Sequence, residues 1–297
     1  MIELRTGDLT LGLVPSLGGS VSHFRLGAID LMRPLSSEAH LQDVRCAAMF
    51  PMVPYANRIA GNAFKFGGEV WRFIANNPPE RFNVHGTGWQ SAWDIEDRKA
   101  DEAVLVLNHL APDEPYSYLA KQQFSLSKQR LVVTITLTNR GDRTMPFGFG
   151  FHPWFKRAPD VTVAFRATHF WMEGPDGIAT DALRTPPELD FTVARALPET
   201  WRNNDYGGWS GTAEICSPSQ GFGLRIEADP IFRHLVLYAN PVSPCFCLEP
   251  QTNAVCAFNK MNLGHEADLG VIELRPGSSA AGSVSFIPFA LQGGHLT

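Results

Sequence analysis

The feature that most constrains the fold is an alternation of apolar and polar side chains over residues 131–138. Successive side chains of a β-strand point to opposite faces, so this pattern predicts a strand with one buried face. The apolar positions are Leu131, Val133, Ile135 and Leu137. A turn is expected at residues 139–142, where Asn, Gly and Asp occur together. Similar runs predict strands at residues 9–14, 104–107, 161–165, 224–227, 235–238 and 284–289.

Helical periodicity is almost absent from the sequence. The chain carries 26 Gly and 22 Pro residues, scattered throughout, which would interrupt long helices. Gly7-Asp8 and Gly67-Gly68 are typical of tight turns between strands. Many short strands without intervening helices favour an all-β sandwich or barrel. Residues 173–198 resemble a loop, but four apolar side chains are expected to pack it on the body: Leu183, Leu189, Phe191 and Val193. Without a linker or an internal repeat, residues 1–297 are interpreted as one domain.

The composition limits the partners that the chain is expected to have. The net charge is −5, whereas nucleic-acid-binding domains usually carry a basic face, so neither nucleic acid nor an anionic membrane is expected. No apolar run approaches the ~20 residues of a membrane-spanning helix. Five cysteines are an odd number for a disulfide framework and fit a reducing compartment better. With no signal-peptide pattern at residues 1–8, the expected location is the cytoplasm, as a monomer or a homodimer.

Two segments place polar side chains where a sugar could be bound. Asn57-Arg58 lies beside Tyr55, and amide and guanidinium donors bind hydroxyl groups while aromatic rings stack on pyranose faces. His85 precedes Gly86, and a histidine can exchange a proton near neutral pH. Each segment also has a purely structural interpretation, in which Asn57 caps a turn, Arg58 lies on the surface and His85 is a loop residue.

A third segment, residues 147–155, alternates phenylalanine with glycine and ends in His152-Pro153-Trp154-Phe155. In a strand, His152 would share a face with Gly148 and Gly150, which predicts open space for a ligand on that face. Pro153 cannot donate a ladder hydrogen bond, so the strand is expected to end or bulge there. The alternative is an aromatic core strand with an incidental histidine.

The fourth segment ends an apolar run with a carboxylate, Glu249, directly before Pro250. Burial raises a carboxyl pKa and makes the group a better base near neutral pH, whereas a strand-end glutamate in solvent would have no such role. Cys245, Cys247 and Cys256 have no ligand pair at finger-like spacing, so buried thiols are expected and no metal. The chain also has no phosphate-binding loop and no serine-hydrolase elbow.

Taken in order, these segments resemble the aldose 1-epimerase family, also called galactose mutarotase-like proteins. The resemblance implies a large antiparallel β-sandwich and a cofactor-free conversion between sugar anomers. It rests on anchors spread from about residue 50 to residue 280: Asn57-Arg58-Ile59 with Gly61 and Phe64, His85-Gly86, His152-Pro153-Trp154-Phe155, Glu249-Pro250-Gln251, Phe258-Asn259 and Leu274-Arg275-Pro276-Gly277.

The resemblance also implies roles for single residues. Glu249 is expected to take the proton of the anomeric hydroxyl and His152 to protonate the ring oxygen, after which the ring opens, rotates and closes on the other face. His85, Arg58 and Asn57 are expected to bind the sugar. An acid limb of the pH profile is then expected from Glu249 and an alkaline limb from His152.

One position departs from the family pattern. Many members carry an acidic residue before an aromatic one in the segment written here as residues 203–209. By register against Gly208-Trp209, Asn203 occupies the acidic position, and Asp205 could replace it only if the loop shifted. Asn203 is therefore expected to contact the sugar.

Three other functions remain open at this point. A hexose-6-phosphate 1-epimerase would need extra cations near Arg58, which Arg45, Arg72 and Arg81 could supply. A non-catalytic sugar-binding module would have no need of both His152 and Glu249. A glycoside hydrolase would need two carboxylates about 5–10 Å apart, and the sequence places only one.

Overall fold

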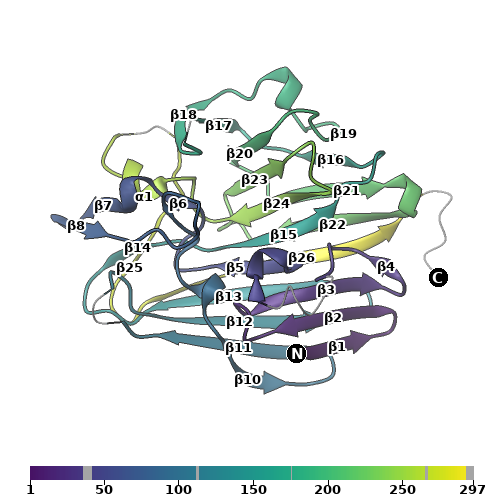
Figure 1. The fold of residues 1–297 in the computed structure, drawn as a ribbon, viewed down its shortest axis with the longest axis horizontal. Helices are drawn as coiled ribbons and strands as arrows, with labels where there is room; N and C mark the ends of the chain where they lie inside the picture. The colour runs from purple at the N-terminus through teal and green to yellow at the C-terminus, as the bar shows by residue number, and fades with distance from the viewer. Residues whose placement is uncertain (36–41, 112–113, 175, 265–266, 292–297) are drawn as a thin grey trace.

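The computed structural model describes residues 1–35, 42–111, 114–174, 176–264 and 267–291. The described chain is dominated by two large antiparallel sheets (Figure 1). Phe, Leu, Val and Ile side chains from both sheets form one continuous buried cluster between them. The predicted fold, a large antiparallel β-sandwich, is confirmed.

The larger sheet has eleven strands and carries most of the segments singled out in the sequence. Its order is β1-β2-β3-β5-β15-β24-β23-β20-β17-β18, with β4 paired to β3. The bounds are β1 Ile2–Thr6, β2 Leu9–Val14, β3 Ser20–Leu26, β4 Ile29–Asp30, β5 Met49–Met52, β15 Gly150–Lys156, β17 His169–Glu173, β18 Ala179–Leu183, β20 Arg202–Gly207, β23 His234–Ala239 and β24 Cys245–Gln251.

The smaller sheet has nine strands in the order β10-β11-β12-β13-β26-β22-β21-β16-β19. The bounds are β10 Asp94–Arg98, β11 Glu102–His109, β12 Tyr118–Leu126, β13 Leu131–Asn139, β16 Thr162–Phe165, β19 Arg195–Ala196, β21 Thr212–Ser217, β22 Phe222–Ala228 and β26 Ser279–Ala290.

Short elements complete the described chain. Three two-stranded ribbons pair β6 (Arg58–Ile59) with β9 (Asn83–Val84), β7 (Ala63–Phe66) with β8 (Glu69–Arg72), and β14 (Met145–Phe147) with β25 (Ile272–Leu274). Among the described residues the only α-helix is α1, Ala257–Lys260. Short 3₁₀ turns lie at Val44–Cys46, Ala60–Asn62, Gly88–Gln90, Pro187–Leu189 and Pro218–Gln220. None of the described helices is long and apolar enough to span a membrane.

The alternation seen in the sequence corresponds to burial in the structure. The four apolar residues between 131 and 137 are all fully buried, and each of the predicted runs falls within or closely matches a strand. Both predicted tight turns join paired strands, β1 to β2 and β7 to β8. Residues 173–198 agree only in part, because Leu189 and Phe191 are buried while Leu183 and Val193 are exposed.

The larger sheet is buried on both of its faces near its centre. In β24, Phe246 and Leu248 point into the core between the sheets. The alternating residues Cys247, Glu249 and Gln251 point to the other face, yet they are also buried. A loop layer therefore covers the outer face here, and this is where a small molecule could be enclosed.

Pro153 does not end its strand, contrary to the sequence-based expectation. β15 continues to Lys156, and Pro153 pairs with Met49 of β5. Instead, the hydrogen-bonded ladder between β15 and β24 is interrupted. The paired residues on either side of the interruption keep the same register. The interrupted stretch contains Pro153 and Pro250, which both lack the N–H group that a ladder needs.

The register of these two strands sets the position of the predicted catalytic residues. It is fixed by cross-strand pairs on either side of the interruption, Gly150 with Gln251 and Trp154 with Cys247. This register places His152 directly opposite Glu249 on the outer face. Side chains opposite each other in an antiparallel pair start only about 4.5–5.5 Å apart at Cβ, so the two residues must meet.

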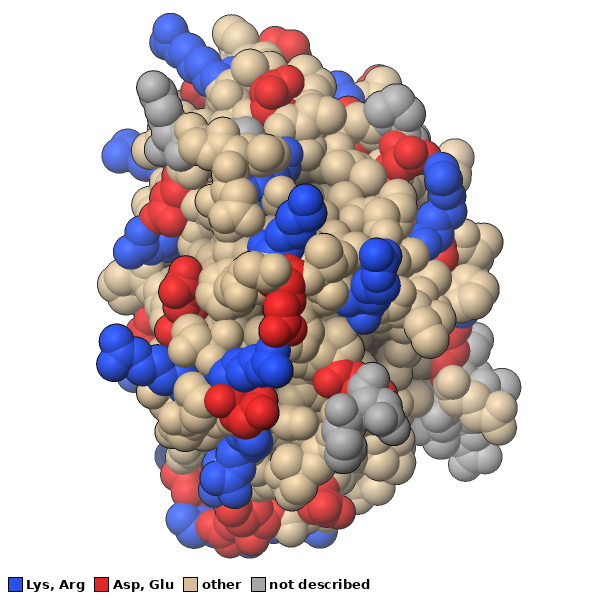
Figure 2. Space-filling model, turned by 90° about the vertical axis from the view of Figure 1, so that its left-hand side faces the viewer, with Lys and Arg blue, Asp and Glu red and all other residues tan. Residues whose placement is uncertain are grey.

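Charged side chains of both signs are mixed over the face shown in Figure 2. Lys and Arg residues there lie next to Asp and Glu residues rather than gathering into one basic region. Some oppositely charged side chains form salt bridges, for example Lys121 with Glu96 at 2.6 Å.

Candidate active site

A cavity of about 270 Å³ lies on the outer face of the larger sheet and contains the predicted site residues. Aromatic and polar side chains both line it, so the wall offers apolar faces as well as hydrogen-bonding groups. The aromatic residues of the wall are Phe50, Trp89, Trp154, Trp201 and Tyr238. The polar residues include Asn57, Arg58, Glu80, His85, His152, Asn203 and Glu249.

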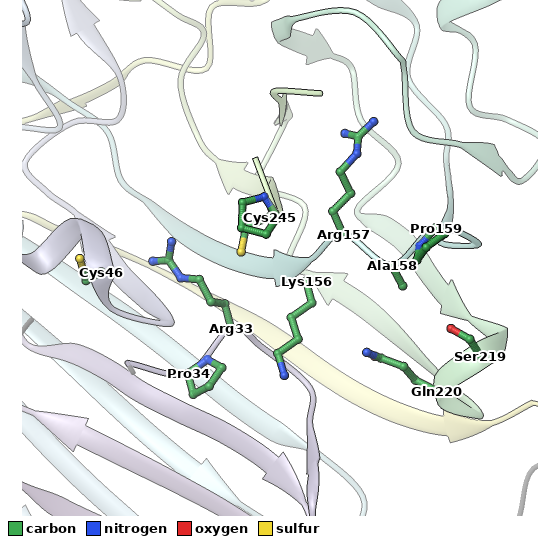
Figure 3. A pocket seen from close by; sticks show the side chains of 11 residues that line it. Arg33, Pro34, Cys46, Lys156, Arg157, Ala158, Pro159, Ser219, Gln220 and Cys245 are labelled. Atoms are coloured by element: carbon green, nitrogen blue, oxygen red, sulfur yellow. The ribbon is translucent and has the colours of Figure 1, made fainter. Parts of the chain in front are cut away.

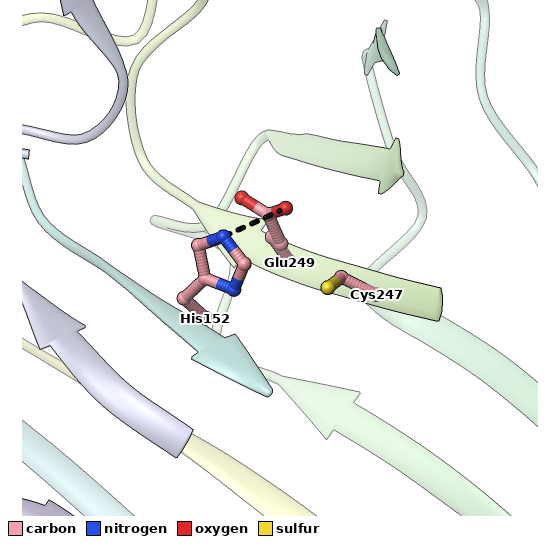
Figure 4. A group of neighbouring side chains, drawn as sticks. All are labelled: His152, Cys247 and Glu249. Atoms are coloured by element: carbon pink, nitrogen blue, oxygen red, sulfur yellow. Dashed lines mark ion pairs between the residues drawn. The ribbon is translucent and has the colours of Figure 1, made fainter. Parts of the chain in front are cut away.

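His152 and Glu249 meet at the base of this cavity. Nε2 of His152 lies 3.4 Å from Oε1 of Glu249, as the dashed line in Figure 4 shows. The imidazole is held between two rings, Phe50 at 4.5 Å and Trp154 at 5.2 Å between centroids, both stacked on it. Packing on both faces fixes the ring, so its orientation toward the carboxyl group is set before a ligand arrives.

Burial controls the protonation of this pair. It raises the pKa of Glu249 to about 8, with the charge of Arg58 acting in the opposite direction. It lowers the pKa of His152 to about 3, and the charge of Arg33 adds to this effect. Between these two values the pair holds one transferable proton, which rests on the carboxyl group.

His85 is buried, and a backbone hydrogen bond fixes which of its ring nitrogens carries the proton. Its Nδ1 accepts a hydrogen bond from the backbone N–H of Asn57 at 3.0 Å, so the proton of the neutral ring is on Nε2. Burial lowers the pKa of His85 well below its usual value, followed by the charges of His152 and Arg58. His85 can therefore donate a hydrogen bond from Nε2 but remains uncharged.

Backbone strain accompanies this arrangement. Asn57 and His85 both have a positive φ, 63° and 60°, which non-glycine residues rarely adopt. The two residues are also linked by the hydrogen bond from the N–H of His85 to the carbonyl oxygen of Asn57, 2.9 Å long. Strained backbone that surrounding contacts enforce is common at functional sites.

Arg58 is fixed by a carboxylate that the sequence did not reveal. Glu80 accepts hydrogen bonds from Nε and Nη2 of Arg58 at 3.1 and 2.8 Å. Nη1 of Arg58 donates to the amide oxygen of Asn57 at 3.3 Å. The guanidinium charge is thus largely balanced before any ligand binds.

Asn203 and Asp205 are the two candidates for the position at which many family members carry an acidic residue, and the structure distinguishes them. Asn203 lines the cavity, whereas Asp205 does not. Asp205 is 1% exposed, and its two oxygens accept hydrogen bonds from Nδ1 of His234 and the backbone N–H of Val255, both at 3.0 Å. Asp205 therefore holds strand β23 to the loop after β24, and Asn203 is the one available to a ligand.

The glycines near His152 do not open space for a ligand, which corrects the sequence-based expectation. A Cβ at Gly148 would lie 2.0 Å from Oδ1 of Asn253. At Gly150 it would lie 2.7 Å from the Cε of Met52 and from the carbonyl oxygen of Pro250. The glycines thus permit close packing around the base of the site, and the cavity itself lies between the aromatic residues.

One group of potential metal ligands occurs at the site. Ligand atoms of His152, Cys247 and Glu249 lie within 4.8 Å of one another (Figure 4). The sequence suggested no such set, because His152 comes from a different strand from Cys247. Burial raises the pKa of the Cys247 thiol well above its usual value, which keeps it in the protonated form that binds metals poorly.

A second cavity, of about 670 Å³, lies elsewhere on the larger sheet (Figure 3). It contains three cations, Arg33, Lys156 and Arg157, whose charged ends point in different directions. Lys156 is paired with Asp30 at 2.7 Å, and the other two donate to backbone carbonyl groups. These residues do not converge on a common point, so the smaller cavity is the better candidate site.

The family model for aldose 1-epimerases matches residues 1–286. The chain belongs to the aldose 1-epimerase family. The uncharacterized protein YphB of Escherichia coli (strain K12) is 31% identical over 290 residues, which are 95% of this chain and 96% of that protein. A crystal structure of a proposed aldose 1-epimerase from Escherichia coli K12 matches with a TM-score of 0.90 and 30% identity, over 97% of this chain and 98% of that chain.

Other solved structures share the fold at lower sequence identity. A GalM/aldose epimerase homologue from C. elegans has a TM-score of 0.81 at 17% identity, covering 98% of each chain. A galactose mutarotase-like protein from Clostridium acetobutylicum has a TM-score of 0.82 at 18% identity, over 97% of this chain and 95% of that chain. The resemblance drawn from the ordered motifs is confirmed at the level of family and fold.

All six residues predicted for the site line one cavity. They come from β6 and the residue before it, the loop after β9, and strands β15, β20 and β24. Sequence reasoning missed several residues of the wall, chiefly Glu80, Trp201 and Tyr238. Only Tyr238 had a usable signal, because the alternation of the predicted strand at 235–238 placed it opposite the core face.

The separate roles of Asp205 and Asn203 can be tested by denaturation. Asp205→Asn replaces an acceptor with a donor inside a buried network, so it should lower the free energy of unfolding by roughly 1–3 kcal/mol. Asn203→Ala should change the free energy of unfolding much less, because Asn203 borders the cavity. Urea unfolding curves of the two variants measure this difference. A wild-type curve for Asp205→Asn would contradict the structural role given to Asp205.

Proposed function

We propose that this protein interconverts the α and β anomers of an uncharged aldose by acid–base opening and closure of the sugar ring. The main support is the contact between His152 and Glu249, an imidazole and a buried carboxyl group 3.4 Å apart in a cavity lined by aromatic and polar side chains. Anomer exchange needs one proton removed from the C1 hydroxyl and one delivered to the ring oxygen. A pair that shares one proton can do both.

The proton path follows from this geometry. In the reactive form the shared proton is on His152, and the Glu249 carboxylate accepts the proton of the anomeric hydroxyl. As the C1–O5 bond breaks, His152 gives its proton to O5 and the aldehyde forms. Rotation about C1–C2 presents the other face of the carbonyl group, and the reverse transfers close the ring. The pair ends with the one proton that it had at the start.

The other polar residues of the cavity would bind and orient the sugar. His85 can donate from Nε2 to a sugar oxygen without competing as an acid. Arg58 and Asn57 can donate to hydroxyl groups, since the Asn57 oxygen is already engaged by Arg58. Asn203 can contact a hydroxyl group from the far strand β20. The aromatic wall offers apolar faces on which a pyranose ring can stack.

An uncharged sugar fits the cavity better than a sugar phosphate. The two arginines that line the cavity, Arg45 and Arg58, are each paired with a carboxylate, Asp43 at 2.8 Å and Glu80 at 2.8 Å. Arg81 is paired with Asp176 at 2.7 Å, and Arg72 lines a different cavity. A phosphate dianion would have to displace these carboxylates to gain its usual partners.

Hydrolysis of a glycoside fits the site less well. Such enzymes use two carboxyl groups, and two line this cavity, Glu80 and Glu249. Glu80, however, is engaged in an ion pair with Arg58 through two hydrogen bonds, so of the two only Glu249 has no Arg or Lys partner among the described residues. The proposed reaction needs only Glu249 and His152, and it requires neither a metal ion nor a nucleotide.

Glu249→Gln is the direct test of this function. Glutamine keeps the shape of the side chain but cannot accept a proton, so the rate of mutarotation should fall by roughly 10²–10⁴-fold. Polarimetry on freshly dissolved α-glucose and α-galactose measures this rate. Glu96→Gln, an exposed change on the other sheet, should keep the wild-type rate. A Glu249→Gln variant with near-normal kcat would show that Glu249 is not the base.

The pH profile should show the order of the two pKa values. Because burial raises the pKa of Glu249, the pair loses its only proton as the pH rises through about 8, and kcat/KM should fall there. Because burial lowers the pKa of His152, the second proton binds only near pH 3, so activity should persist in mild acid. This order reverses the sequence-based assignment of the two limbs.

Polarimetry from mild acid to pH 10, corrected for spontaneous mutarotation, measures this profile. The limbs describe the pair rather than either residue alone. A loss of kcat/KM centred near pH 6 on the alkaline side would contradict the assignment, because it would mean that an ordinary histidine carries the required proton.

A further inference from the structure

Two residues of the cavity wall share one carboxylate that lies outside the cavity. Trp201, just before β20, donates from Nε1 to Oε2 of Glu173 at 3.3 Å. Asn203 donates from Nδ2 to Oε1 of the same carboxylate at 3.1 Å. Glu173 is the last residue of β17, the strand paired with β20 (Figure 1). One side chain therefore touches two residues that a ligand would contact.

The carboxylate decides which way the Asn203 amide faces. An ionised carboxylate only accepts hydrogen bonds, so the NH₂ group must point to Glu173. The amide oxygen is then left for the cavity, as an acceptor for a hydroxyl group. Without Glu173, this contact would not determine whether the NH₂ group or the oxygen of the Asn203 side chain faces the cavity.

The same carboxylate holds the Trp201 ring in place. The indole is 48% exposed, so its packing alone would leave it free to rotate. Its edge also contacts Tyr238, with the ring centroids 5.2 Å apart and the planes at 87°. The hydrogen bond to Glu173 and the contact with Tyr238 together fix the face that the ring presents to the cavity.

Glu173 does not look like a residue placed for stability. It is partly buried, and its desolvation raises the pKa of the carboxyl group despite two hydrogen bonds that oppose this effect. The neighbouring carboxylate Asp181, on β18, is exposed. Placing an anion behind two ligand-contacting side chains costs desolvation, and its visible effect is to orient them.

We propose that Glu173 is a positioning residue that selects the sugar. It would make the site specific for an aldose that offers a hydroxyl donor to the Asn203 oxygen while an apolar face of its ring stacks on Trp201. This proposal rests on the function proposed above and adds the residue that determines the substrate preference. Glu173 would act only through these two side chains and would take no part in proton transfer.

The test exchanges donor and acceptor between Glu173 and Asn203. Glu173→Gln removes the constraint on the amide, so KM for the preferred aldose should rise roughly tenfold while kcat changes little. Asn203→Asp alone places two carboxylates together and should also raise KM. In the double variant the introduced amide can donate to the introduced carboxylate, whose second oxygen faces the cavity. The double variant should therefore bind better than either single variant.

Rescue in the double variant separates orientation from general stability. Asp181→Asn removes one exposed negative charge from the neighbouring strand and serves as the matched control, with KM expected at the wild-type value. Urea unfolding of each variant confirms that it is folded. A Glu173→Gln variant with KM within twofold of wild type would overturn the proposal, as would a double variant no better than both single variants.

Sugar binding is measured in parallel by tryptophan fluorescence and calorimetry with glucose and galactose. If the wild-type protein binds an aldose but does not speed mutarotation, the proposed function fails, and the order of the variants in binding still decides the role of Glu173. If activity is present and the variants bind alike, only the role of Glu173 fails. No binding of either sugar by the wild-type protein would overturn both.

Discussion

The contact between His152 and Glu249 depends on the pairing of strands β15 and β24. Their register places the two residues opposite each other on the outer face of the sheet, across a stretch where Pro153 and Pro250 interrupt the ladder. Phe50 and Trp154 stack on the imidazole, and the carboxyl group of Glu249 is buried beside it. The site is thus built into the sheet, and the loops add the groups that would bind a sugar.

Burial gives this pair its chemical character. A buried carboxyl group is costly to ionise, and a buried imidazole is costly to protonate. The two effects leave one proton on the pair over a wide pH range. Arg58 favours the ionised form of Glu249, but Glu80 balances most of its charge. The environment therefore places the shared proton on Glu249 at rest, and the reactive form requires its transfer to His152.

The sequence predicted the strands well, because alternation at residues such as Leu131–Leu137 directly reflects a buried face. The ordered motifs also identified the residues that line the cavity, including Asn203 rather than Asp205. Contacts between distant segments could not be predicted: Glu80 beside Arg58, and Glu173 behind Asn203, have no local pattern. The glycines before His152 were misinterpreted, because a missing side chain can make room for a neighbour as easily as for a ligand.

The central claim is that His152 and Glu249 act as one acid–base unit. NMR saturation transfer between the α and β anomeric protons measures the exchange rate at equilibrium for the wild-type protein, for His152→Asn, for Glu249→Gln and for the double variant. Residues that act as a unit lose their effect together, so all three variants should fall to a similar low rate. The account would be contradicted if the rate losses of the two single variants multiplied in the double variant. It would also be contradicted if the wild-type protein exchanged the anomers no faster than buffer alone.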